Sequence, residues 1–295
     1  MSSSKSEVRV FLRNRKSASS VLSLAAIALL SGATGAHAAI SYNTGSLGAA
    51  ANGTDADSVT SGPGAVSAGG DLSAVYDGVA GSNTVVPYQP ALNPASASPF
   101  TVEFWARPTA SDNDDAPVSN RVSAGNRSGW VFFQRAADAG WNFRMYNGAG
   151  GGLGWDLTGG TSALDSWNHV VATWNGSAAQ LYVNGALADS TNDPAATGAY
   201  NASSAADFII ASTDSGSPYA GSVDEAAFYG TALSAEQVLN HFGTATTGAA
   251  GAYHSLVRAD GALLQLSNNA IPEPSAIVMM GAAGMLLVRR RVAGR

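Results

Sequence analysis

FTVEFWARP, at residues 100–108, has the clearest structural pattern in this chain. Apolar side chains at positions 100, 102, 104 and 106 alternate with Thr101, Glu103, Trp105 and Arg107. An alternation with a period of two places the two sets of side chains on opposite faces of a β-strand. The stretch therefore predicts a β-strand.

Similar short stretches follow, separated by turn residues: GWVFFQR (129–135), WNFRMYN (141–147), HVVATWNG (169–176), QLYVNGALA (180–188), FIIAS (208–212) and VDEAAFYG (223–230). The fourth contains Asn184-Gly185, a strong signal for a two-residue hairpin turn. One amphipathic helix is predicted after Ser234, a suitable N-cap with Gln237 at the capping-box position. Many short strands and one short helix predict an all-β protein, either an antiparallel sandwich or a barrel.

Five stretches occur in an order that resembles the laminin-G-like, concanavalin-A-like jelly-roll domain: AVYDG (74–78), FTVEFWARP, SWNHVVATWNG (166–176), LYVNGALA (181–188) and GSVDEAAFYGTALSAEQV (221–238). The resemblance covers residues 72–242. It implies an all-β fold, an antiparallel jelly-roll β-sandwich with one short C-terminal helix, and often a structural calcium ion (Ca²⁺). Lectins, adhesins and glycosidases share this fold, so the resemblance does not imply one activity.

Two regions of small residues flank the predicted domain. Residues 39–71 are mostly Gly, Ala, Ser, Thr and Asp, with little to bury, and we expect a flexible N-terminal segment there. Residues 243–270 begin with GTATTGAAG, which is typical of a linker. A small hairpin around Asp260-Gly261 is expected to follow it.

Residues 1–38 have the order of a secretory signal peptide. Basic residues up to Lys16 precede the apolar run VLSLAAIALL (21–30) and the small residues Ala36-His37-Ala38. Ten apolar residues are too few to span a bilayer, whereas they suit the apolar region of a signal peptide. We predict that the protein is exported and cleaved after Ala38.

Residues 271–295 have the reverse order. Pro272, Glu273 and Pro274 precede an apolar run (276–288), which is followed by Arg289, Arg290 and Arg291. As a helix the run would rise about 20 Å, short of the roughly 30 Å hydrocarbon core. The tail resembles a PEP-CTERM sorting signal. That resemblance implies processing by an exosortase-type enzyme in the envelope of an exopolysaccharide-producing Gram-negative bacterium, with only transient membrane contact through the tail. The alternative is a permanent short membrane anchor.

Charge and composition restrict the ligands of the body between these signals. Residues 39–271 contain six arginines, no lysine and nineteen Asp and Glu, which gives a net charge of −13. Such a body repels nucleic acid and anionic membranes, and it is compatible with neutral sugars or with cations such as calcium. The chain has no cysteine, which excludes disulfides and thiol chemistry. Its histidines are not at metal-ligand spacing, so we expect no zinc site.

Catalysis is the first function class to weigh, because glycoside hydrolases share the fold. Retaining hydrolysis needs two carboxyl groups roughly 5 Å apart. Hydrolases that resemble laminarinases carry Glu-x-Asp-x-(x)-Glu on one strand, and the nearest stretch here is 222–227. Asp224 has the central position, but Ser and Ala replace both glutamates, and Glu225 would point to the opposite face of a regular strand. We therefore predict that the protein is not an enzyme.

Two aspartates are candidate calcium ligands. Asp77 lies in Tyr-Asp-Gly and Asp224 in Gly-Ser-Val-Asp-Glu, stretches that often lie near a metal in the related domains. Carboxylates with nearby backbone carbonyls are the oxygen ligands that calcium prefers. The alternative is that Asp77 begins a turn and Asp224 accepts hydrogen bonds from the backbone. The acidic stretch 112–115 lacks the glycine and glutamate of an EF-hand, which favours a solvated loop.

Sugar binding requires an exposed aromatic face. All six tryptophans lie in the body, and most are expected in the core. Trp155 is the best candidate because it follows the glycine-rich stretch 148–154 and precedes Asp156, which would place a ring and a carboxylate together on a loop. Tyr146 and Arg144 are its weaker companions.

Two function classes remain for an exported, non-catalytic domain. It is either a carbohydrate-binding module with an extracellular polysaccharide as its partner, or a structural matrix component that contacts envelope proteins. Exposed aromatic rings in a groove would favour the first class, and a flat polar surface would favour the second.

Overall fold

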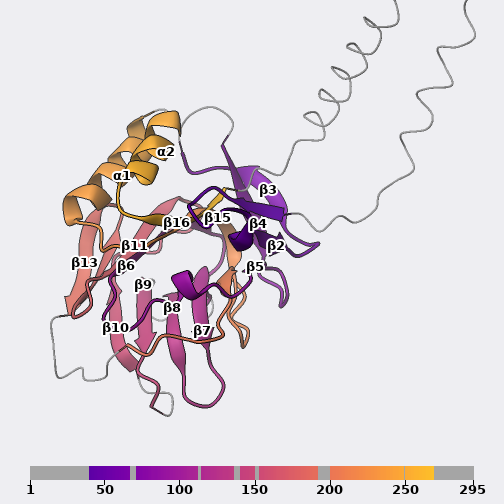
Figure 1. Cartoon of the computed structure of the whole chain (residues 1–295). Coiled ribbons are helices and arrows are strands. Elements are labelled where there is room, and N and C mark those ends of the chain that lie inside the picture. Colours follow the sequence, from indigo (N-terminus) through magenta and orange to yellow (C-terminus); the bar gives the residue numbers. More distant parts are fainter. Residues whose placement is uncertain are drawn as a thin grey trace, which may run out of the picture. The chain divides into compact units, whose positions relative to one another are not determined.

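The computed structural model describes residues 40–66, 71–111, 114–135, 140–149, 153–191, 200–248 and 250–268. Both predicted signals, residues 1–38 and 271–295, lie outside this part of the chain. Within it, strands dominate and two α-helices come near the C-terminal end (Figure 1). The strands are β1 (Ile40–Asn43), β2 (Gly53–Asp55), β3 (Thr60–Pro63), β4 (Leu72–Asp77), β5 (Thr84–Val86), β6 (Phe100–Pro108), β7 (Val118–Val122), β8 (Ser128–Gln134), β9 (Trp141–Tyr146), β10 (Leu153–Gly159), β11 (Asn168–Trp174), β12 (Ala179–Val183), β13 (Ala186–Thr191), β14 (Phe208–Ile210), β15 (Ala220–Tyr229) and β16 (Leu263–Asn268). The helices are α1 (Ala235–Thr247), α2 (Ala250–Ala259) and the short 3-10 helices η1 (Gly48–Ala51) and η2 (Pro90–Leu92).

These strands form two antiparallel sheets, as predicted. Sheet A has the order β10-β9-β8-β7-β14-β5-β2-β1. Sheet B has the order β13-β12-β11-β6-β15. Beyond β15, the first half of that strand pairs with β4 and the second half with β16, while β3 adds to β4. The all-β sandwich expected from the sequence is therefore confirmed.

The main core lies between the two sheets. The apolar set of β6 faces it, with Phe104 in edge-to-face contact with Phe132 at 4.9 Å and Phe100 stacked on Phe228 at 5.5 Å. Aromatic pairs of this geometry add to the stabilisation that comes from buried area alone. Trp130 and Trp141 are also fully buried here, so most tryptophans belong to the core as expected.

A second core lies between sheet B and the two helices. Trp105 of β6 and Tyr229 of β15 meet Val238 of α1 and Tyr253 of α2 in one buried cluster. The predicted helix is α1, and Ser234 and Gln237 form a complete capping box at its start. Because α1 and α2 lie over this face (Figure 1), both faces of β6 are buried. Neither helix has the length and hydropathy needed to cross a membrane.

The expectation of a flexible segment over residues 39–71 is wrong for its described part. Strands β1, β2 and β3 lie in it and pair with other strands of the two sheets. Backbone hydrogen bonds hold such strands without large apolar side chains. Polar side chains add to this: Asn43 accepts from the backbone N–H of Leu266 at 2.9 Å, and Thr84 donates to the buried Asp55 at 2.5 Å.

The expectation of a linker and a small hairpin over residues 243–270 is also wrong. Helix α1 continues to Thr247, and the structure has a second helix, α2, in place of the first hairpin strand. Its residues Tyr253 and Val257 are four apart and therefore bury on one helix face. Gly261, with a φ of +64°, lies in the turn from α2 into β16.

Candidate functional site

The predicted sugar-binding tryptophan is buried. Trp155 lies in strand β10, is 6% exposed, and packs edge-to-face against Trp174 with ring centroids 5.1 Å apart. It belongs to the core between the sheets. A ring held there offers no face to a pyranose, so the prediction for Trp155 is wrong. The alternation of β10 decides this, because it turns Asp156 outward and Trp155 inward.

The three companions of Trp155 lie on the outer face of sheet A. Arg144 and Asp156 face one another across β9 and β10 and form an ion pair, with Nε and Oδ1 3.2 Å apart. Tyr146 is buried, and its hydroxyl accepts a hydrogen bond from Arg121 at 3.0 Å. The structure thus brings Arg144 and Asp156 together and separates both from the ring of Trp155.

The two predicted calcium ligands do not share a site. Asp77 pairs with Ala220 in the β4–β15 ladder, four residues from Asp224. At a rise of about 3.3 Å per residue, this separates the two positions by roughly 13 Å. Oxygen ligands of one calcium ion lie within about 2.3–2.6 Å of it, so these two carboxylates cannot hold one ion together. The predicted pair is wrong.

Local hydrogen bonds explain both aspartates. Asp224 accepts from the backbone N–H groups of Ala65 at 2.8 Å and Glu225 at 2.9 Å. Burial, and then the neighbouring charges of Glu225 and Asp71, raise the pKa of Asp224 well above its usual value. Asp77 accepts from the N–H of Val79 at 2.9 Å, as expected for an Asp-Gly turn. The alternative stated for these residues therefore describes their contacts.

A pocket of about 510 Å³ lies where β4 and β6 end and β15 begins. Its size is within the roughly 300–1,000 Å³ typical of small-ligand sites. Close backbone contact shapes one wall: Gly78 has a φ of +74°, and a Cβ there would lie 2.8 Å from the Cβ of Ala220. The lining residues are Asp77, Gly78, Ala110, Asp114, Asp115, Ser217, Pro218 and Ala220.

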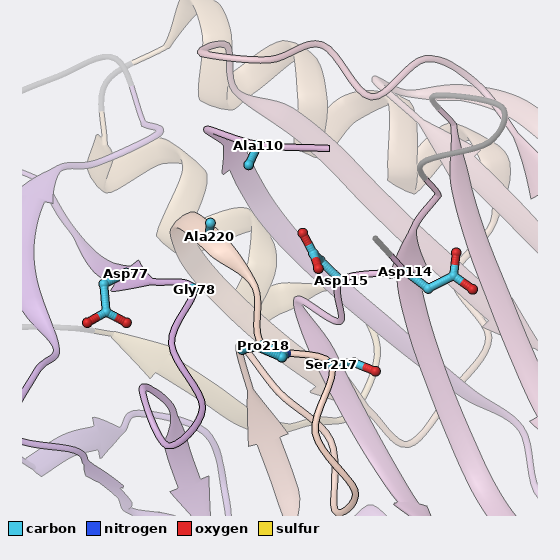
Figure 2. Close-up of a pocket in the computed structure, with 8 residues that line it drawn as sticks. All are labelled: Asp77, Gly78, Ala110, Asp114, Asp115, Ser217, Pro218 and Ala220. Atoms are coloured by element: carbon cyan, nitrogen blue, oxygen red, sulfur yellow. The ribbon is translucent and has the colours of Figure 1, made fainter. Parts of the chain in front are cut away.

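Three carboxyl groups give the pocket its chemistry. Figure 2 shows Asp115 between Asp77 and Asp114, whose side chains lie on opposite sides of the view. Asp114 forms an ion pair with Arg135 at 2.9 Å, and Asp77 is exposed, whereas Asp115 is 7% exposed. The pocket therefore presents mainly hydrogen-bond acceptors, together with the hydroxyl of Ser217.

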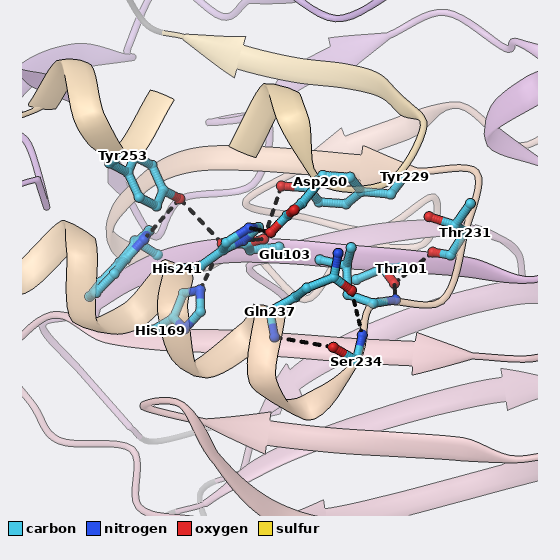
Figure 3. A network of polar contacts seen from close by, with 12 residues as sticks. Thr101, Glu103, His169, Tyr229, Thr231, Ser234, Gln237, His241, Tyr253 and Asp260 are labelled. Atoms are coloured by element: carbon cyan, nitrogen blue, oxygen red, sulfur yellow. Dashed lines mark hydrogen bonds and ion pairs between the residues drawn. The ribbon is translucent and has the colours of Figure 1, made fainter. Parts of the chain in front are cut away.

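A buried polar network lies on the other side of sheet B, beneath the helices (Figure 3). Glu103 of β6 is at its centre and has no exposed surface. His169 and His241 lie 2.8 Å from its two carboxylate oxygens, and the hydroxyls of Tyr229 and Tyr253 donate to it at 3.1 and 3.3 Å. The second ring nitrogen of His241 is 3.1 Å from Asp260.

The contacts of His241 indicate its protonation. Both nitrogens of His241 face carboxylates, so its ring carries both protons and a positive charge. Nδ1 of His169 is buried and has no hydrogen-bond partner among the described residues, so His169 contacts Glu103 through Nε2 alone. Burial lowers the pKa of His241, but Glu103 and Asp260 together raise it above its usual value. Burial raises the pKa of Glu103, but the charge of His241 and the hydrogen bonds from both histidines lower it well below its usual range.

An irregularity in β15 adds a second polar group beside this network. The register against β6 shifts between Asp224 and Ala227, and Glu225 has a φ of +48°. This bulge directs Glu225 toward α2, where Oε1 lies 2.7 Å from Nε2 of His254. Ligand atoms of Asp71, Glu225 and His254 lie within 4.8 Å of one another. The expectation of no zinc site was based on the spacing of the histidines along the chain, whereas the fold brings His254 close to two carboxylates from distant parts of the chain.

Comparisons with known proteins agree with the observed fold. Residues 77–239, more than half of the chain, match the Laminin_G_3 family, the concanavalin A-like lectin/glucanases superfamily. No curated protein matches the chain. The binding domain of Paraclostridial Mosquitocidal Protein 1 is a similar solved structure, with 18% identity, a TM-score of 0.51, and coverage of 69% of this chain and 52% of that one.

Two further structures are similar. The binding domain of Botulinum Neurotoxin serotype G has 14% identity, a TM-score of 0.53, and coverage of 71% of this chain and 51% of that one. A Trypanosoma rangeli sialidase in complex with the inhibitor DANA has 13% identity, a TM-score of 0.44, and coverage of 65% and 29%. The chain spans about half the length of the two toxin binding domains. The family match and the sandwich agree, and the chain belongs to the concanavalin A-like lectin/glucanases superfamily.

Proposed function

We propose that this domain is a non-catalytic carbohydrate-binding module and that its ligand occupies the pocket beside Asp77 and Asp115. The observation that carries the proposal is the pocket of about 510 Å³, with three carboxyl groups and a serine hydroxyl in its wall. Sugar hydroxyls are hydrogen-bond donors, and carboxylates accept hydrogen bonds strongly. Such a pocket suits a polyhydroxylated ligand.

The charge of the pocket favours a neutral sugar. Its described lining residues include three aspartates and no Lys or Arg, within a body of net charge −13. An anionic sugar would be repelled, because no lining cation compensates its carboxylate. Stacking is not part of this mode of binding, since no described aromatic side chain is among the exposed large hydrophobic ones.

The burial of Asp224 and Glu225, the two carboxyl groups with raised pKa values, supports a non-catalytic role. Burial raises the pKa values of Asp224 and Glu225, as a general acid requires, but both side chains are 0% exposed. A sugar ring cannot reach them. The two toxin structures, which are named as binding domains, share the fold and support a binding role by analogy.

A glycan array on residues 39–271 tests the binding proposal, with calcium and with a chelator as separate arms. We propose that a calcium ion binds together with the glycan at this pocket. Binding of a neutral glycan is expected to weaken roughly 10- to 100-fold in Asp77→Asn, the equivalent of one lost charged hydrogen bond. The matched control is Asp57→Asn, which removes the same charge from an exposed residue outside the pocket.

Two results would oppose this function. Equal loss of binding in both variants would mean that total charge, and not the pocket, attracts the glycan. Reproducible release of reducing sugar from any β-glucan would show that the domain is an enzyme.

We also propose export and sorting of the chain. The support is the order of basic, apolar and small residues before Ala38, and the Pro272-Glu273-Pro274 motif, apolar run and arginines of the tail. The intact mass of the protein from its native host should correspond to a chain that begins at Ala39 and lacks residues from near Pro272 onward. A mature chain that keeps Arg289–Arg291 would contradict sorting by an exosortase-type enzyme and would favour a membrane anchor.

Protein contact is the second candidate function. Leu187 of β13 and Leu239 of α1 are 53% and 54% exposed, and β13 is an edge of sheet B. Leu239 lies against the β12–β13 turn, because a Cβ on Gly185 would be 3.1 Å from it. Two exposed leucines beside an edge strand favour contact with another protein. Leu187→Asp with Leu239→Asp should then abolish co-purification with envelope proteins while glycan binding persists.

A further inference from the structure

Asp71, Glu225 and His254 come from three separate parts of the chain. Asp71 directly precedes β4, Glu225 lies in the bulge of β15, and His254 lies in α2. One ligand atom from each lies within 4.8 Å of the others. Two of the three residues lie outside residues 77–239, so the cluster is not part of the family match.

Glu225 provides an independent indication of a ligand. Its side chain is 0% exposed, and one carboxylate oxygen, Oε1, is paired with His254 at 2.7 Å. The other oxygen, Oε2, is buried and has no hydrogen-bond partner within the described part of the chain. A buried carboxylate oxygen without a donor is costly, and a cation between these side chains would satisfy it.

We propose that Asp71, Glu225 and His254 form a binding site for a divalent transition-metal ion of the zinc type, which fastens α2 and the segment before β4 to β15. Two carboxylates and one imidazole are a donor set that zinc accepts, with a water molecule or a further oxygen as the fourth ligand. The imidazole argues against calcium and magnesium, which take oxygen ligands.

Asp224 supports the ligands without binding the ion. Its two oxygens accept from the N–H groups of Ala65 and Glu225. Asp71 is oriented by the N–H of Val66, which donates to its Oδ2 at 3.0 Å. Outer hydrogen bonds of this kind orient metal ligands and tune their affinity.

The ion reaches the site from solvent. His254 has 21% of its side chain exposed and Asp71 is partly exposed, whereas Glu225 lies beneath them. The site therefore joins the two segments that flank the family domain. In a chain without cysteine, a metal ion performs the cross-linking that disulfides perform in other exported domains.

The test uses the full-length protein after treatment with EDTA. Titration calorimetry with zinc sulfate should show one ion per chain, bound on the order of a hundredfold tighter than calcium because of the imidazole ligand. The melting temperature should rise by about 5–10 °C at a hundredfold excess over Kd. X-ray absorption should show nitrogen and oxygen ligands at about 2.0–2.2 Å. Magnesium and calcium at matched ionic strength should give no comparable rise.

Variants separate metal binding from a structural role of the same residues. His254→Ala and Asp71→Asn should lose the zinc-dependent rise, whereas Asp57→Asn should keep it. Glu225→Gln should also lose the rise; in EDTA it should melt somewhat lower than the original protein, because His254 loses its buried partner, so the zinc-dependent rise of each folded variant is the quantity compared. A zinc effect that equals that of magnesium, or that survives in His254→Ala, would overturn the proposal.

Discussion

Glu103 is a carboxylate without exposed surface that accepts hydrogen bonds from two histidines and two tyrosines. Its charge is compensated by His241, which in turn contacts Asp260. The network thus joins β6 to β11, α1, α2 and the turn after α2. Removing a partner from a buried ion pair leaves an uncompensated charge, which is more costly than the pair itself is stabilising.

Glu103→Gln should therefore destabilise the domain strongly. The variant keeps the shape of the side chain but leaves the buried imidazolium of His241 without its main counter-charge. We expect a loss of about 3 kcal/mol in the free energy of unfolding, measured by urea denaturation. Glu236→Gln is the control, since Glu236 is an exposed residue of α1 and should change stability by less than about 1 kcal/mol. Equal midpoints for the two variants would show that the network contributes nothing.

The pH dependence of stability should follow the two histidines with raised pKa values. In EDTA, with no metal ion on His254, both His241 and His254 bind a proton more tightly in the folded protein than in the unfolded chain. Their contribution is complete below the unfolded pKa of about 6.5 and is lost as the pH rises through the folded pKa values. Asp224 and Glu225, whose pKa values are raised, act in the same direction, so the melting temperature should fall from pH 6.5 to pH 9.

Substitution identifies the source of this pH dependence. His241→Asn, combined with His254→Asn, should make the fall in melting temperature above about pH 6.5 less steep, and the part that remains is the contribution of Asp224 and Glu225. Glu103 has the opposite sign, because its lowered pKa stabilises the fold at neutral pH and this contribution is lost only in acid. An unchanged alkaline slope in the double variant would contradict the assignment.

The sequence predicted the orientation of these polar residues but not what covers them. The period-two alternation of residues 100–108 places Glu103 and Trp105 on one face, opposite Phe104. Nothing local in that alternation indicates a helix above the face. Residues 243–251 were interpreted as a linker, so His254 had no assigned neighbours, and the approach of His241 and His254 from the helices to sheet B could not be anticipated. The prediction for Trp155 was wrong for a related reason, because a glycine-rich stretch indicates a loop but does not indicate where the next strand begins.

At the scale of elements, local signals that involve the backbone were reliable. Asn184 and Gly185 have φ values of +52° and +77° and join β12 to β13, as the hairpin signal predicts. The bulge of β15 has no comparable signal: a regular strand would send Glu225 into the core between the sheets, and only the structure shows that it turns toward α2.

The start of α1 provides a test at this scale. Ser234→Ala removes the side chain that accepts from the N–H of Gln237 at 3.2 Å. The variant should lose about 1 kcal/mol of stability, because an orphan N–H of the first turn is left without its partner. Ser234→Thr, which keeps a hydroxyl, should lose less, and thermal unfolding of both variants measures the difference. A Ser234→Ala variant as stable as the original would mean that tertiary packing alone holds the helix.

At the scale of the whole molecule, the folded unit is larger than the family match. The match ends at residue 239, but α2 and β16 complete the second core and one edge of sheet B. A chain that ends at Gly248 should therefore lose cooperative thermal unfolding, because Trp105 and the network around Glu103 become exposed. A chain that ends at Ile271 keeps every described element and should melt like the full-length protein. Calorimetry of the two truncations checks this, and a cooperative transition in the shorter one would contradict it.

Strand β1 has a consequence for the order in which the molecule folds. It pairs with β2 in sheet A and with β16 in sheet B, and Asn43 bonds to Leu266 across 223 residues of sequence. A chain emerges from the ribosome N-terminus first, so the partner of its earliest strand is among the last residues to appear. Contacts of such long sequence separation form slowly, because the entropy of closing the loop must be overcome first. Until β16 has been made, β1 and the second half of β15 each have one edge without a partner, which another chain can bind. Mispairing with another chain therefore remains possible until β16, near the end of the domain, has been synthesised.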